Sequence, residues 1–397
     1  MDSETMTRSR APSRGGLEVT VARTREAAEE LRPVWERHRW PRVDADIDYF
    51  LAVTDTQEGD SRPYVVALSG DAEGMFVGRL EDAHLWAGIG YRTLYRPRVR
   101  SLVLAHGGLA GTENPAVCDA LCDQLFGSLR AGEADVLILP ALPMDSPFAR
   151  AVKARLSSFD RRTAVGAEAT HRRQVLPESV EAFLESKAPK TRYGWTRPGK
   201  KLTKEFGDRL SLVKYREPGD VERIFADQVV VAEKTYQQGL GVAFGDTERQ
   251  HRLVELALDR GWYRSYVLYL DGKPIAFWPG IAYERVFFVG TPGYDPELAR
   301  YSLGAYLQLE IVADLCLDPD VDIVDFGFGD AEYKRRLGTE SWTEQEILVF
   351  APTLRARRIQ LVRGGILGAA SLAKRLLGEG RVAALKKRWR ERLSRKG

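Results

Sequence analysis

The segment 321–338, VDIVDFGFGDAEYKRRLG, constrains the fold more than any other part of the chain. It opens with the pattern of a buried strand, in which two aspartates interrupt four apolar residues: Val321, Ile323, Val324 and Phe326. Gly327 and Gly329 then predict a turn, and Asp330, an N-cap residue type, predicts the start of a helix. A strand, a glycine turn and a helix in this order place polar groups at the carboxyl end of the strand, where α/β sheets hold ligands.

The residues after the turn concentrate polar chemistry within a short stretch. A phenol, an amine and two guanidiniums follow one another: Tyr333, Lys334, Arg335 and Arg336. Asp325 lies in the strand just before the turn, whereas Asp322 alternates to the opposite face and is expected to lie outside any site.

This stretch resembles the D-F-x-x-G-x-x-x-Y-K signature of a bacterial acyltransferase family called BioF-like or CelD-like. The matching residues are Asp325, Phe326, Gly329, Tyr333 and Lys334. The family is built on the GNAT (general N-acetyltransferase) fold and is related to the FemABX transferases of peptidoglycan synthesis. The resemblance covers residues 17–350, firmly in the second half and loosely in the first.

A second match to the family is Ser302-Leu303-Gly304 before the helical run AYLQLEIVADLC. The family usually has Ser-Pro-Gly here, so Leu303 departs from the pattern, while Gly304 keeps the close backbone approach that glycine allows. An ordinary helix start is the alternative, with Ser302 as the cap and a core stripe of Leu303, Leu307, Ile311 and Leu315.

The predicted fold class is α/β with an α+β mixed sheet. The second half reads as strand, two helices, three strands, helix, strand, helix, strand, which is the order of a GNAT domain. The resemblance implies tandem GNAT-like domains, although no internal repeat is visible in the sequence. The predicted segments are a disordered N-terminus (1–16), a degenerate GNAT-like domain (17–178), a basic connector (179–208), a GNAT acyltransferase domain (209–352) and a basic amphipathic tail (353–397).

The resemblance implies an acyl-CoA donor, whose pyrophosphate rests on the amino end of the helix after the fourth strand. Free N–H groups and the helix dipole make such an end attractive to anions. The candidate donor-binding residues run from the preceding strand into the helix: Val289, Gly290, Arg300, Ser302, Leu303, Gly304 and Ala305.

The candidate catalytic residues are Asp325, Tyr333 and Lys334. Many GNAT enzymes keep a tyrosine at the position of Tyr333 as general acid to the leaving thiolate, and Lys334 would supply positive potential. Asp325 is the candidate base. The alternatives remain open: Tyr333 packs its ring and bonds a carbonyl, and Asp325 forms a buried salt bridge with Lys334 or Arg336.

Metal binding and disulfides find little support. The five histidines (His38, His84, His106, His171 and His251) never lie within four residues of one another, and each is interpreted as a surface or packing residue. Three cysteines do not suggest a disulfide scaffold, and Cys118 and Cys122 are expected to pack in a core. No metal is expected.

Two segments are strongly basic. In the connector, Pro189, Pro198 and Gly199 are expected to interrupt any long helix, and Tyr193 and Trp195 leave nucleic-acid stacking as an alternative to packing on a domain. From residue 355 to the end, 14 Lys or Arg and two Glu give a charge of +12, and since the whole chain carries +3, the remainder carries −9.

The tail reads as an amphipathic helix over 381–396, preceded by an apolar but glycine-broken stretch. It suits an anionic membrane surface, or else docks on the acidic body. No apolar run reaches the ~18 residues of a membrane span. The N-terminus lacks a secretory h-region, so a cytoplasmic, membrane-peripheral protein is expected.

The predicted function is an acyl-CoA-dependent N- or O-acyltransferase acting on a sugar, a polysaccharide precursor or a small metabolite, with cell-envelope polysaccharide as the implied setting. The first alternative is a FemABX-type transferase using aminoacyl-tRNA, which would make the connector an RNA contact. The second is a non-catalytic GNAT-like scaffold at the membrane.

Overall fold

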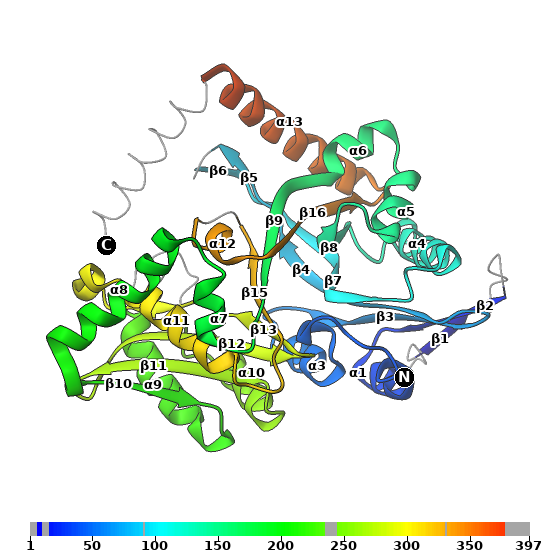
Figure 1. Ribbon diagram of the computed structural model, residues 1–397. Helices are drawn as coiled ribbons and strands as arrows, with labels where there is room; N and C mark the ends of the chain where they lie inside the picture. The colour runs from blue at the N-terminus through cyan, green and yellow to red at the C-terminus, as the bar shows by residue number, and fades with distance from the viewer. Residues whose placement is uncertain (1–5, 10–15, 90–91, 235–243, 330–331, 378–397) are drawn as a thin grey trace. The chain divides into compact units, whose positions relative to one another are not determined.

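The computed structural model describes residues 6–9, 16–89, 92–234, 244–329 and 332–377. Contacts within the chain define two compact units, shown in Figure 1. The first unit contains the residues up to 168 and those from 343 onward, and the second contains residues 169–342. The chain therefore enters the second unit near residue 169 and returns to the first near residue 343.

The second unit has the element order that the sequence predicts. Its elements are β10 (Leu210–Tyr215), α9 (Val221–Ala232), α10 (Glu248–Asp259), β11 (Tyr263–Leu270), β12 (Lys273–Tyr283), β13 (Val286–Val289), α11 (Leu303–Leu315), β15 (Ile323–Phe328) and α12 (Glu332–Leu337). Asp271 and Gly272, with φ of 52° and 75°, form the predicted two-residue turn between β11 and β12. The predicted helix start at Asp330 lies outside the described residues.

The first unit repeats this order. Its elements are β2 (Leu17–Ala22), α1 (Arg25–Glu30), α3 (Ile47–Asp55), β3 (Ser61–Gly70), β4 (Gly74–His84), β7 (Arg98–Ala110), α4 (Pro115–Arg130), β8 (Val136–Pro143) and α5 (Pro147–Arg155). Strands β7 and β8 are parallel, as are β13 and β15. The structure thus contains two copies of one strand–helix pattern, which the sequence did not reveal.

The two copies exchange their last strands. Strand β9 (Val165–Val175) follows the first copy but pairs antiparallel with β15 of the second unit. Strand β16 (Glu340–Phe350) follows the second copy but pairs antiparallel with β8 of the first unit. The sheet of each unit is therefore completed by a strand that the other copy provides.

Each unit has its own apolar core. In the first unit, α4 packs on the sheet and buries Cys118 and Cys122, as predicted. In the second unit, α11 buries the predicted stripe of Leu303, Leu307, Ile311 and Leu315.

The connector forms a helix, α8 (Pro189–Phe206), so the expectation that its prolines interrupt any long helix is wrong. Pro189 occupies the first turn, where a missing N–H costs nothing. Pro198 is internal, but it lies in a buried stripe with Trp195 and Leu202. Packing of this stripe outweighs the lost backbone hydrogen bond. Trp195 is therefore a core residue, whereas Tyr193 is exposed.

Both ends of the chain depart from expectation. Met6–Ser9, within the segment predicted to be disordered, form strand β1 antiparallel to β2. The stretch predicted to be glycine-broken lies in one continuous helix, α13 (Leu354–Leu377), which belongs to the first unit. The predicted helix over 381–396 lies outside the described residues.

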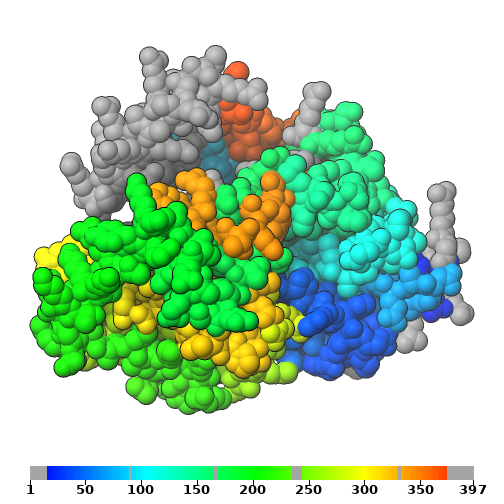
Figure 2. All heavy atoms as spheres, viewed as in Figure 1, coloured from blue at the N-terminus to red at the C-terminus, as the bar shows by residue number. Residues whose placement is uncertain are grey.

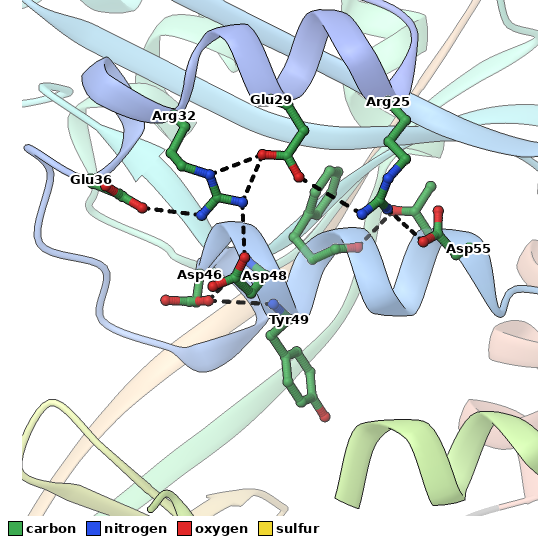
Figure 3. A network of polar contacts seen from close by, with 10 residues as sticks. Arg25, Glu29, Arg32, Glu36, Asp46, Asp48, Tyr49 and Asp55 are labelled. Carbon is green, nitrogen blue, oxygen red and sulfur yellow. Dashed lines mark hydrogen bonds and ion pairs between the residues drawn. The ribbon is translucent and has the colours of Figure 1, made fainter. Parts of the chain in front are cut away.

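An ionic network ties α1 and α2 (Arg32–Trp35) to α3 (Figure 3). The Arg32 guanidinium donates to Glu29, Glu36 and Asp48, and Arg25 donates to Asp55 over 2.5 Å. Because each of these carboxylates is already held by an arginine, the network reads as structural support for the first unit.

Candidate active site

The site begins where β13 and β15 part. Their parallel ladder covers three residue pairs, from Val286↔Ile323 to Phe288↔Asp325. Both strands continue beyond it, β13 to Val289 and β15 to Phe328. Asp325 is therefore the last β15 residue paired with β13, and the polar residues after it follow the end of the ladder.

The Asp325 carboxylate is buried, and its hydrogen-bonding capacity is largely used. Oδ1 and Oδ2 lie 2.7 and 2.9 Å from Nε2 of His171, and the N–H of Gly327 donates to Oδ1 over 2.6 Å. Gly327 has φ of 66°, a conformation that glycine adopts without strain. The carboxylate therefore fixes the glycine turn as well as binding the imidazole.

His171 is the site residue that the sequence did not reveal. Its side chain is fully buried and lies on the exchanged strand β9. The imidazole stacks on Trp342 with ring centroids 4.3 Å apart and an interplanar angle of 11°, and Phe328 meets it edge-on. His171 is therefore a packing histidine, as interpreted from the sequence, but it also forms a hydrogen bond with the Asp325 carboxylate that the sequence did not predict.

The predicted ionic partners of Asp325 make other contacts. Arg336 pairs with Glu332, one turn earlier in α12. The Lys334 amine donates to the carbonyl oxygen of Phe328 over 2.8 Å. The prediction that Asp325 forms a salt bridge with Lys334 or Arg336 is therefore wrong. The carboxylate instead contacts His171 on the neighbouring strand β9. Asp322, by contrast, pairs with Arg285 on the surface, away from Asp325, as expected.

Tyr333 and Lys334 lie beside the strand end. The Tyr333 ring meets Phe326 edge-on at 6.3 Å, and its side chain is 37% exposed. Burial raises the pKa of the Tyr333 phenol, so the hydroxyl stays protonated at neutral pH. Burial lowers the pKa of the Lys334 amine, and the nearby charge of Asp325 opposes this shift. The three predicted catalytic residues thus gather around one strand–helix junction.

The amino end of α11 joins an exposed residue, Ser302, to a buried one, Leu303. Ser302 has a left-handed conformation (φ 58°, ψ 47°), and its side chain makes no capping hydrogen bond, so the expectation of Ser302 as an ordinary cap is wrong. Leu303 is buried, and its side chain packs in the core of the second unit. No atom lies within 4 Å of where a Cβ on Gly304 would be. Ala305 completes this first turn, its N–H bonded to the carbonyl of Ser302.

The remaining candidate donor-binding residues flank this turn. Val289 ends β13 and packs partly on the core, while the backbone of Gly290 is bonded to Pro279 and Trp278. Arg300 is exposed, and its carbonyl accepts from Lys201 of α8 over 3.1 Å. Helix α8 therefore brings a basic side chain next to the segment that leads into α11.

Within the described residues, no group of three His, Cys, Asp or Glu side chains is placed to hold a metal ion. His251, for example, pairs with Asp246 and stacks on Phe225. None of the helices described is long and apolar enough to cross a membrane.

The comparisons with known proteins concern the fold and the domain. Residues 189–335 match a family model described as "Acetyltransferase (GNAT) domain". The crystal structure of FemX is similar over 85% of this chain and 98% of that chain, with a TM-score of 0.56 and 10% sequence identity. No curated protein matches the sequence.

Two weaker structural likenesses are a tandem GNAT protein from the clavulanic acid biosynthesis pathway and the C-terminal domain of a putative lysylphosphatidylglycerol synthetase from Agrobacterium fabrum. Each has a TM-score of 0.48, with 13% and 12% identity; they cover 85% and 86% of this chain and 99% and 96% of theirs.

These findings confirm two predictions. The fold is mixed α/β with a GNAT domain over residues 189–335, and the likeness to FemX covers 85% of the chain. The matched domain includes α11, Asp325 and Tyr333, and it makes the chain an acyltransferase of GNAT type.

Proposed function

We propose that this protein is an acyl-CoA-dependent N- or O-acyltransferase of the BioF-like or CelD-like kind. The acceptor class that the resemblance favours is a sugar, a polysaccharide precursor or a small metabolite. One observation carries the proposal: the signature residues Asp325, Tyr333 and Lys334 surround the point where the β13–β15 ladder ends.

The amino end of α11 is proposed to hold the donor pyrophosphate. The first N–H groups of an α-helix lack intrahelical partners, and here they include those of Leu303 and Gly304. The open space at the Gly304 Cβ position supports this role, because a phosphate would approach the backbone closely there. Arg300 and Lys201 add positive charge to the segment before the helix.

Tyr333 is proposed to protonate the leaving thiolate. Its raised pKa keeps the proton on the phenol until the sulfur develops negative charge. The partial exposure of Tyr333 leaves the hydroxyl accessible to a thioester. Lys334 is proposed to supply positive potential beside it, held in place by the Phe328 carbonyl.

Asp325 is proposed to accept the proton that the acceptor loses, with His171 fixing its orientation. The carboxylate contacts Nε2 of His171 through both oxygens and accepts from the N–H of Gly327, which fixes its position at the end of β15. An alternative consistent with the same contacts is a purely structural Asp325 that shapes the turn 327–329.

A FemABX-type transferase using aminoacyl-tRNA is the second candidate. The specific observation in its favour is the solvent face of α8, where several basic side chains accompany the exposed Tyr193: Lys190, Arg192, Arg197, Lys200, Lys201 and Lys204. Such a face suits a phosphate backbone with one stacked base. Against it, Trp195 is buried and unavailable for stacking.

We further propose that residues 355–397 contact an anionic membrane surface, because their charge of +12 opposes a body of −9.

Calorimetric titration of the purified protein with CoA, acetyl-CoA and longer acyl-CoAs tests the donor. Saturable binding is expected, with thermal stabilisation that grows with ligand concentration. Absence of binding to every CoA species, together with activity that ribonuclease destroys, would instead establish the aminoacyl-tRNA alternative.

A further inference from the structure

The first unit exposes an unusual number of large apolar side chains on two neighbouring elements. One is the hairpin of β5 (Ala87–Ile89) and β6 (Arg92–Tyr95), and the other is α13. Helix α13 packs on β5, and Arg355 of its first turn donates to the carbonyl of Arg98, just after the hairpin, over 3.0 Å. The two elements therefore adjoin, although more than 250 residues separate them in sequence.

The hairpin turns its largest apolar side chains outward. Trp86 and Leu94 are 46% and 48% exposed, whereas Leu85 is buried in the core of the unit. The register of the hairpin shifts at Ala87/Gly88, which leaves Leu94 as the extra residue of a bulge. Trp86 donates from Nε1 to the Thr93 hydroxyl over 2.9 Å, so the indole is held in its exposed position.

Helix α13 also exposes apolar side chains. Its inner face buries Ala356, Ile359 and Gln360. Its outer face carries Leu361 and Leu372, each 58% exposed, with Gly365 and Gly368 at helical spacing between them. In Figure 2 the orange-red atoms of α13 lie at the molecular surface. Apolar residues gathered on the outer face of a surface helix mark a candidate binding surface.

The charged residues within the two segments themselves have one sign. Residues 83–100 contain four arginines and residues 354–377 contain six Lys or Arg, and neither segment contains an Asp or Glu. Carboxylates elsewhere pair with Arg98, Arg355 and Arg357. Arg92, Arg96 and Arg358 are exposed and form no ion pair with any other residue that the structure describes.

We infer that these two elements form a docking site for the headgroup region of an anionic lipid bilayer, made of Trp86, Leu94, Arg96, Arg358, Leu361 and Leu372. Tryptophan and leucine enter the boundary between headgroups and acyl chains, and arginines contact lipid phosphates. The two segments contribute no carboxylate of their own, which limits the repulsion that an anionic surface would meet. A second protein copy would need no such one-sided charge.

This hairpin–α13 site rests on the membrane contact proposed above for residues 355–397. It adds the β5–β6 hairpin, which is far from these residues in the sequence. The two parts make different predictions. If the site is correct, the hairpin contributes to lipid binding even when residues 378–397 are present, and binding survives in part when they are removed.

Flotation of the full chain with vesicles tests the site, using phosphatidylcholine alone and phosphatidylcholine with phosphatidylglycerol. The parent is expected to bind only the anionic vesicles, and less so as salt rises. The variant Trp86→Ser with Leu94→Ser should bind on the order of tenfold more weakly, as should Arg92→Gln with Arg96→Gln. Leu317→Ser, at a 78% exposed leucine of the second unit, is the matched control and should bind like the parent.

Three results would overturn the inference. One is parent-like vesicle binding by both hairpin variants, which would leave any lipid contact to the tail. Another is absence of parent binding to anionic vesicles. The third is sedimentation showing a parent dimer that the hairpin variants dissociate, since a second copy would then be the occupant. Acyl-CoA binding without lipid, measured in parallel, reports on the proposed enzymatic function separately.

Discussion

Both carboxylate oxygens of Asp325 lie within 2.9 Å of Nε2 of His171, and the two residues come from different copies of the repeated fold. The imidazole is enclosed between Trp342 and Phe328, so it cannot reach a substrate itself. Its contribution is to hold a buried carboxylate at the end of β15, where the ladder with β13 stops.

Replacing His171 with Phe is therefore expected to lower the free energy of unfolding by about 3 kcal/mol, because the buried Asp325 carboxylate loses its imidazole partner. Chemical denaturation measures the loss. In the double variant with Asp325→Asn much of the penalty should disappear, since no charge then remains to be compensated. Additive losses in the double variant would show that the two side chains do not interact.

Tyr333→Phe and Asp325→Asn should leave acyl-CoA affinity nearly unchanged and lower turnover by roughly 10² to 10⁴ if each acts in proton transfer. The pH dependence of turnover distinguishes the two variants. Loss of the base should be relieved at high pH, where an acceptor amine deprotonates unaided, whereas loss of the acid should persist. Thioester hydrolysis offers a first assay, and parental rates for both variants across the pH range would make these residues structural.

Gly304→Val should abolish thermal stabilisation by acyl-CoA while the protein still folds, because the Cβ position is empty in the protein alone. Valine there would block close approach of a phosphate to the backbone. Gly194→Val in α8 is the matched control, since its Cβ position is also open and lies in another helix. Normal CoA binding by the Gly304 variant would move the donor site elsewhere.

Cys122 should resist alkylation in the folded protein. Burial raises its pKa to about 12, above the usual value of a thiol, so little thiolate exists at pH 8. The protonated thiol favours the folded state, and this contribution to stability is fully present below the thiol pKa of the unfolded chain, ~8.5. It is lost as pH rises through the folded-state pKa. Mass spectrometry after iodoacetamide treatment, with and without denaturant, measures the protection, and rapid labelling of folded protein would contradict it.

The second unit was predictable because its local signals agree with its packing. The apolar stripe of α11 and the Asp271-Gly272 turn follow from residue spacing alone, and the strand predicted over 321–326 lies at 323–328. The two wrong predictions of helix breaks have one cause. Pro198 and the glycines of α13 predicted breaks, but a buried stripe in α8 and packing on the first unit override weak local preferences.

His171 could not be recognised as a site residue from the sequence, for a different reason. Its partner is 154 residues away and is reached only through the exchange of β9, so nothing around His171 in the sequence marks it. Asp325 was identified by its motif, but its contact with His171 depends on the pairing of β9 with β15. Long-range strand pairing is the information that spacing within one segment does not carry.

The exchange of β9 and β16 also determines when, during synthesis, strand β8 can find its partner. The edge of β8 is formed once residue 143 is made, yet its antiparallel partner, from Glu344 to Phe350, is among the later parts of the chain to emerge. At ribosomal rates of roughly 5–20 residues per second, that edge waits for roughly 10 to 40 s. An unpaired strand edge is open to association with other chains throughout. The nascent first half is therefore the form of this protein that a chaperone has most reason to bind.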